Sequence, residues 1–133
     1  MEDTIICLDT SVLIDYYRKK DKSATLFYRL TDRYSVFAVS AITEYELYVG
    51  TSGEQQDFWN IFFQKITVLP FDTDSAKQSI TIYKQLKAKN RMIDIPDILI
   101  AGTVLKNEIL FATLNRKHFE RIDGLRLLNY EAL

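Results

Sequence analysis

The chain has 133 residues, which is most simply one domain and is long enough to bury a hydrophobic core. Hydrophobic residues make up 47% of the sequence and charged residues 26%, as is typical of a soluble globular protein. The formal net charge is −1, and the basic residues gather only in short segments that are more often solvated helix ends than nucleic-acid contacts. One cysteine, Cys7, and one histidine, His118, are too few for an internal disulfide or for a zinc site built from Cys and His.

The sequence has no segment that indicates a membrane or secreted protein. No stretch is apolar for long enough to span a bilayer, and the N-terminus lacks a charged-then-apolar signal pattern. We therefore expect a cytoplasmic protein without membrane association, in which Cys7 is a small core residue.

Strands and helices are expected to alternate along the chain. Short apolar runs predict strands, and apolar residues at spacings of three and four predict helices. In chain order, the sequence predicts a strand at 4–9, helices at 11–19 and 22–33, a strand at 35–40, a helix at 41–50, a helix through 55–65, a strand at 66–71, a long helix after Asp72, a helix at 96–107, a strand at 109–113 and a last strand within 125–130.

Several residues mark the expected ends of these helices. Asp72 is placed to cap the long helix, and Pro96 suits the first turn of the next one. Ser52 and Gln55 have the spacing of a capping box, and Gly50 is a natural C-terminal stop. Because strands alternate with helices, we predict an α/β fold with a parallel sheet between helical layers. No repeat or linker interrupts the sequence, so residues 1–133 are expected to form a single domain.

Oxygen-bearing side chains follow the expected strand ends. Asp9 follows the first strand, segment 113–115 follows the fourth, and Asp97 lies in the first turn of the helix before that strand. If these strands are neighbours, their carboxyl ends meet at one edge of the sheet. Converging carboxylates repel one another unless a cation is present, and oxygen ligands suit Mg²⁺ or Mn²⁺. Each acid also has a structural interpretation, since Asp9 can cap a helix and Asp97 can face a helix dipole.

Two further acids share the helix expected at 41–50. Glu44 and Glu46 are two residues apart, so they point in directions about 200° apart on a helix. Only one of them can face a given site, and the periodicity does not say which. Thr43 and Glu46 also have capping-box spacing, which is a structural explanation without chemistry.

Four segments in this order resemble a known family: "LDTSVLIDYYR", "SAITEYELYVG", "DILIAGTVLKN" and "FATLNRKHFERIDGLRLLNY". Together they look like a PIN domain of the VapC type, the toxin half of bacterial toxin–antitoxin pairs. The resemblance implies a three-layer α/β/α sandwich with a mostly parallel central sheet of four to five strands. It also implies Mg²⁺- or Mn²⁺-dependent endoribonuclease activity, a homodimer and a small antitoxin partner of the VapB type. Structured tRNA or rRNA loops would be plausible substrates by the same resemblance.

The resemblance also assigns site residues. Asp9, Glu46 and Asp97 match the family's first three acidic positions and would be catalytic, with Asp9 and Asp97 holding the metal. Ser11 and Thr113 would position the carboxylates, although each also suits a helix start or a strand end.

The family's fourth position, often Asp, is Asn115 here, which keeps an oxygen but loses a charge. Asp94 could replace that charge, although the helix geometry equally suits a solvent-facing Asp94, and we expect solvent.

Parts of the sequence are also compatible with other functions. A strand-end Asp is also the nucleophile of haloacid-dehalogenase-like phosphatases, but those need a second acid two residues later, where this chain has Ser11. The main alternative is a catalytically inactive PIN-like adaptor that binds RNA or protein. The aromatic residues Phe58, Trp59, Phe62 and Phe63 are expected in the core, with a partner surface as the alternative.

Overall fold

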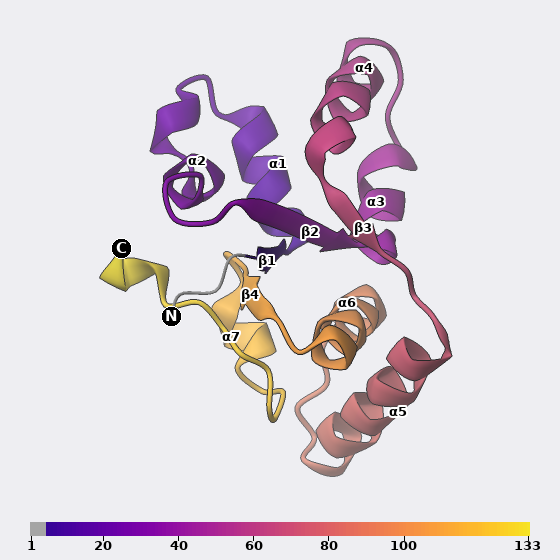
Figure 1. Cartoon of the computed structure of the whole chain (residues 1–133). Helices are drawn as coiled ribbons and strands as arrows, with labels where there is room; N and C mark the ends of the chain where they lie inside the picture. Colours follow the sequence, from indigo (N-terminus) through magenta and orange to yellow (C-terminus); the bar gives the residue numbers. More distant parts are fainter. Residues whose placement is uncertain (1–4) are drawn as a thin grey trace.

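The computed structural model describes residues 5–133 as a four-stranded parallel sheet between two helical layers (Figure 1). The strands are β1 (Ile5–Leu8), β2 (Val36–Ser40), β3 (Thr67–Leu69) and β4 (Leu110–Ala112), in the order β3-β2-β1-β4. The helices are α1 (Thr10–Arg18), η1 (Lys22–Ala24), α2 (Leu26–Leu30), α3 (Ala41–Tyr48), α4 (Gly53–Phe62), η2 (Phe63–Lys65), α5 (Thr73–Ala88), α6 (Ile95–Asn107), α7 (Arg116–Phe119) and η3 (Tyr130–Ala132). The predicted α/β/α architecture is confirmed, and residue 4 of the first expected strand lies outside the described residues.

The first strand is apolar throughout because both of its faces are covered. Ile6 and Leu8 pack against the layer of α1, α2 and α4, while Cys7 packs against α6 and α7 on the other side. The Cys7 side chain is fully buried, and burial is the main cause that raises the pKa of its thiol. Cys7 is therefore the core residue that the sequence predicted.

The strand order brings the functional segments together. β1 pairs in parallel with both β2 and β4, and Leu8 lies opposite Ala112 in the register. The next residue of each strand, Asp9 and Thr113, therefore emerges at the same edge of the sheet. The backbone amide of Asp9 continues the ladder by donating to the carbonyl of Ala112, at 2.9 Å.

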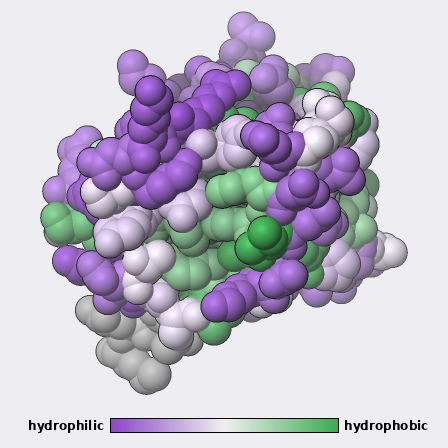
Figure 2. Space-filling view, turned by 90° about the horizontal axis from the view of Figure 1, so that it is seen from above, coloured by the Kyte–Doolittle hydropathy of each residue, from purple (hydrophilic) through white to green (hydrophobic). Residues whose placement is uncertain are grey.

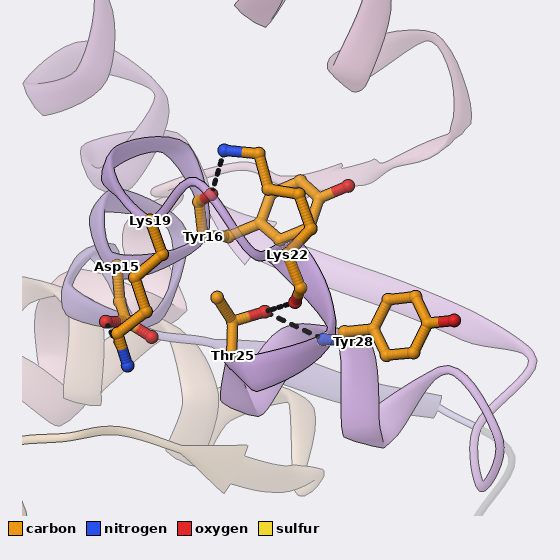
Figure 3. Close-up of polar contacts among 6 residues, drawn as sticks. All are labelled: Asp15, Tyr16, Lys19, Lys22, Thr25 and Tyr28. Carbon is orange, nitrogen blue, oxygen red and sulfur yellow. Dashed lines mark hydrogen bonds and ion pairs between the residues drawn. The ribbon is translucent and has the colours of Figure 1, made fainter.

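The helix expected at 22–33 is broken into η1 and α2. Thr25 ends the first piece and caps the second, because its hydroxyl donates to the carbonyl of Lys22 and accepts from the amide of Tyr28. The ammonium of Lys22 turns back to the end of α1 and donates to the carbonyl of Tyr16 at 2.5 Å (Figure 3). It also donates to the carbonyl of Tyr17, at 2.8 Å. Polar groups of this segment thus satisfy each other instead of extending one helix.

The structure confirms some of the predicted helix caps and not others. Asp72 caps α5, since its carboxylate accepts from the amide of Ser75, and a proline stands in the first turn of α6 as predicted. Ser52 precedes α4 but makes no capping hydrogen bond, so the predicted capping box is absent. The cap of α3 is Ser40, whose hydroxyl accepts from the amide of Ile42.

The expected last strand was wrong. Within 125–130 the described chain makes one parallel bridge, between Leu127 and Phe111, with hydrogen bonds on each side of it. The segment therefore covers the edge of β4 without adding a strand. No helix in the described part of the chain is long and apolar enough to cross a membrane.

The aromatic stretch serves mainly as core. Trp59 is 1% exposed, while Phe58, Phe62 and Phe63 are half-buried and pack on the cluster that includes Trp59. Figure 2, viewed from the side of α2 and α4, shows apolar surface between hydrophilic margins. The core prediction is confirmed for Trp59, and the half-buried rings leave apolar surface exposed.

Replacement of Gly102 by alanine is expected to destabilise the fold by about 2–3 kcal/mol, because an added methyl group overpacks a tight contact between α5 and α6. A Cβ at this position would lie 2.0 Å from Ser79 Oγ and 2.8 Å from the carbonyl oxygen of Ser75. The hydroxyl can rotate away, but the backbone carbonyl cannot. Urea unfolding measures the difference in the free energy of unfolding. Gly50→Ala is the matched control, since nothing lies within 4 Å of its added Cβ; equal destabilisation by both variants would contradict the prediction.

Candidate functional site

Asp9 is a buried carboxylate at the C-terminal end of β1, and its residue is 3% exposed. Its Oδ2 accepts hydrogen bonds from Ser11 Oγ at 2.6 Å and from Thr113 Oγ1 at 2.7 Å. Its Oδ1 is buried and has no hydrogen-bond partner among the described residues. Asp9 occupies the N-cap position of α1 but makes no capping hydrogen bond, so capping does not explain this side chain. A buried carboxylate oxygen without a partner is costly unless a cation or donor approaches it.

Glu46 is the acid of α3 that reaches the start of α1. Its Oε1 accepts a hydrogen bond from Thr10 Oγ1 at 2.8 Å, and the Thr10 hydroxyl is also hydrogen-bonded to Thr43 Oγ1 at 2.9 Å. Glu44 lies beside Tyr48 instead, where burial first and the Glu44 charge second raise the pKa of the phenol. Of the two glutamates that periodicity left open, Glu46 is therefore the one that contacts the start of α1.

Thr10 and Thr43 were missed as site residues by the sequence reasoning. Thr43 is fully buried in the third position of α3, so the capping-box interpretation of Thr43 and Glu46 is wrong. The sequence indicated them only by their positions relative to the predicted acids. Thr10 follows Asp9 directly, and Thr43 precedes Glu46 by about one helical turn.

Asp97 lies in the first turn of α6 and is half-buried. Its pKa is raised to about 6, first by burial and then by the negative charges of Asp9, Glu46 and Asp94. A first-turn acid that only faced the helix dipole would be stabilised in its charged form. The shift to a higher pKa shows that burial and repulsion dominate, and it places the predicted acids in one electrostatic cluster.

Asp94 is exposed at the N-cap of α6 and makes no capping hydrogen bond. Its charge is the smallest of the causes that raise the pKa of Asp97. The expectation that Asp94 faces solvent is therefore confirmed, although its charge still reaches the cluster.

Asn115 is held by the loop and by α7. Its backbone amide donates to Thr113 Oγ1 at 2.9 Å, and its side-chain nitrogen lies 2.7 Å from Nδ1 of His118. The amide of Leu114 donates to Ser11 Oγ at 3.1 Å. The loop after β4 is thus fastened to the start of α1 by the two hydroxyls that also contact Asp9. His118 had no predicted role, and the structure gives it one as the partner of Asn115.

The acids of this cluster are candidate ligands for a divalent cation. Within residues 5–133, no three His, Cys, Asp or Glu side chains form a ready-made metal-ligand group. The unpartnered Asp9 Oδ1 and the raised pKa of Asp97 nevertheless both indicate uncompensated negative charge at one place. The residues fit Mg²⁺ or Mn²⁺ in their chemistry, with oxygen donors only.

The sequence was compared with known proteins. Residues 6–125 match the PIN domain family. Ribonuclease VapC1 of Methanocaldococcus jannaschii is 36% identical over 98% of this chain and 90% of its own length. The tRNA(fMet)-specific endonuclease VapC of Shigella flexneri is 29% identical over 90% of this chain and 92% of its own length.

Solved structures give the same relationship. The DNA-bound VapBC of Salmonella typhimurium superposes with a TM-score of 0.84 and 27% identity, covering 95% of this chain and 98% of the other. VapBC2 of Rickettsia felis, bound to a DNA fragment from its promoter, gives a TM-score of 0.81 and 25% identity, covering 93% and 97%.

Proposed function

This chain belongs to the PIN domain family and to its VapC group, and from this membership we propose that it is a ribonuclease that acts as the toxin of a toxin–antitoxin pair. The reaction is hydrolysis of RNA phosphodiester bonds. We assign residues 1–133 to one PIN-like domain that works in the cytoplasm, where its RNA substrate is found. The alternative of an inactive adaptor has no support from the named relatives, which are ribonucleases.

The observation that carries this proposal is the buried, unpartnered Oδ1 of Asp9 beside an Asp97 of raised pKa. We propose that Asp9 and Asp97 hold Mg²⁺ or Mn²⁺. When bound, the cation supplies positive charge that polarises the phosphodiester and lowers the pKa of a water molecule.

The protein's own residues position this chemistry. Ser11 and Thr113 fix one oxygen of Asp9, which leaves the other oxygen for the cation. Glu46, fixed by Thr10, is in place to orient the attacking water as it loses its proton. Asn115 offers a neutral oxygen where the family often has a carboxylate.

The partners follow from the relatives. The structural neighbours are VapBC complexes, so the protein partner is a small antitoxin of the VapB type. One relative is named for tRNA(fMet), and we propose a structured tRNA or rRNA loop as the substrate class here. We also propose a homodimer as the form of the protein.

The test is cleavage of a mixed RNA pool by purified protein free of antitoxin. Discrete cuts with Mg²⁺ or Mn²⁺, and none with EDTA, are expected. Cuts of equal rate in EDTA would overturn the metal assignment. Intact RNA in every condition, from protein with native circular dichroism, would overturn the proposed activity for the RNAs tested.

Thr10→Val is expected to lower the cleavage rate about tenfold, as is typical when a residue that orients a site carboxylate is lost. Valine removes the hydroxyl that holds Glu46 Oε1 and keeps a similar shape. Thr10→Ser keeps the hydroxyl and should retain a rate close to that of the wild type. Single-turnover cleavage measures the effect, and equal rates for Thr10→Val and the wild type would show that Glu46 needs no fixed orientation.

A further inference from the structure

The protein has a small cavity directly beside the acid cluster. It holds about 180 Å³ and is bounded by α1, α3 and α4, which face one another above the sheet (Figure 1). Its lining includes Glu46 from α3, Arg18 from the end of α1, and Gln55 and Trp59 from α4. Because Glu46 belongs both to this cavity and to the cluster, an occupant of the cavity would lie beside the cluster. The volume is below that of a site for a drug-sized ligand and suits a single planar ring system.

Three of the polar side chains that line this cavity have no hydrogen-bond partner among the described residues. Trp59 is 1% exposed, and its indole Nε1 is buried without an acceptor among the described residues. Among the described residues, the side chains of Arg18, which is exposed, and Gln55, which is partly buried, have no hydrogen-bond or ion-pair partner. Of these three groups, only the Trp59 indole is a buried donor that would normally be satisfied. Arg18 and Gln55 can turn their donors towards a ligand without breaking a contact within the protein.

The apolar walls favour a flat ligand. Ile14, Tyr17 and Leu47 complete much of the lining, and the ring of Tyr17 lies 5.6 Å from that of Trp59 at an interplanar angle of 34°. Bases of single-stranded RNA are recognised by contact of their faces with such side chains and by hydrogen bonds to their edges.

We propose that this cavity is a subsite for the nucleobase that flanks the scissile phosphodiester, and that Gln55 and Arg18 read its edge. This assignment rests on the ribonuclease function proposed above. Guanine is the best match, because its O6 and N7 form the acceptor pair that a guanidinium fork recognises, and the amide of Gln55 supplies a donor and an acceptor. The anionic Glu46 at the rim disfavours a phosphate inside the cavity and leaves the base as the part of RNA that enters.

The first test uses binding alone. Trp59 is the only tryptophan in the sequence, so its fluorescence reports directly on the cavity that it lines. Titration with guanosine 5′-monophosphate and Mg²⁺ should give a saturable change in the wild type. Gln55→Leu should weaken this binding about tenfold, the amount lost with one specific base contact. Gln56→Leu, an exposed neighbour on the same helix, is the matched control and should bind as the wild type does. A wild-type signal that does not saturate, or equal binding by both variants, overturns the subsite.

The second test uses cleavage of short RNAs that differ only at the nucleotides on either side of the cut. Gln55→Leu should reduce the preference for one base at one flanking position about tenfold, with little change for the disfavoured bases. An equal loss for every RNA would make Gln55 structural. An unchanged preference with weaker inhibition by the antitoxin would assign the cavity to the protein partner instead.

The two tests separate this inference from the proposed activity. Saturable nucleotide binding without cleavage of any RNA would leave the cavity as a nucleotide-binding site but overturn the ribonuclease assignment and, with it, the position of the base beside a scissile bond. Cleavage of RNA without nucleotide binding would overturn the subsite and leave the ribonuclease assignment standing.

Discussion

Asp9→Asn is expected to lower the rate of RNA cleavage by about 1,000-fold or more, because it removes a carboxylate that we assign to the cation on which charge stabilisation depends. The substitution keeps the shape of the side chain and an oxygen that can accept from Ser11 and Thr113. It replaces the other carboxylate oxygen, which is buried and unpartnered, by an amide nitrogen that cannot bind a metal.

The fold should survive this change. The buried negative charge is removed while an amide donor is left without an acceptor, and these effects oppose each other, so we expect the free energy of unfolding to change by about 1 kcal/mol or less. Single-turnover kinetics and urea unfolding on the same preparation separate chemistry from stability. Asp123→Asn is the matched control, since that side chain is 67% exposed and pairs with Lys89. A folded Asp9→Asn protein with wild-type cleavage would remove Asp9 from the active site.

The central part of the fold could be predicted because its residues carry a strong local signal. Ile6, Cys7 and Leu8 are apolar on alternating faces, which only a strand covered on both sides explains, and the structure buries all of them. Asp9 at the end of such a strand could therefore be placed at the sheet edge. Long periodic helices with a clear cap, such as α5 after Asp72, were predictable for the same reason.

Other features depend on contacts between distant segments. Periodicity alone left Glu44 and Glu46 open, and the contact of Glu46 with Thr10, which is 36 residues away in sequence, appears in no local pattern. At the break between η1 and α2, Lys22 turns back to the end of α1. The periodicity of apolar residues does not predict this contact. The last expected strand failed because Leu127 meets Phe111 in a single bridge at the sheet edge. In each case a tertiary contact decided between local patterns of similar strength.

Asp97→Asn is expected to have opposite effects on stability and activity. The pKa of Asp97 in the folded protein is about 6, above its ordinary value of 3.8. The folded state therefore holds this proton over a pH range in which the unfolded chain has released it. Stability is lost as the pH rises from about 4 to about 6, and the full cost is present at pH 7 and above. Two pKa units correspond to about 3 kcal/mol, and solvent screening of this half-buried group reduces the expected cost to about 1 kcal/mol.

Removing the charge of Asp97 should raise the free energy of unfolding by that amount, while it removes a ligand of the proposed metal site. In EDTA at pH 7.5, Asp97→Asn should be about 1 kcal/mol more stable than the wild type, and the difference should vanish near pH 4. Mg²⁺ or Mn²⁺ should raise the melting temperature of the wild type but not of the variant, because a ligand stabilises only the state that binds it. Cleavage should fall by about 1,000-fold, as for Asp9→Asn. Asp94→Asn removes the charge that affects Asp97 least and should change each quantity only slightly. A variant that is less stable than the wild type in EDTA at pH 7.5 would show that Asp97 is not held against the charges of Asp9 and Glu46, and the proposed metal site would lose its electrostatic basis.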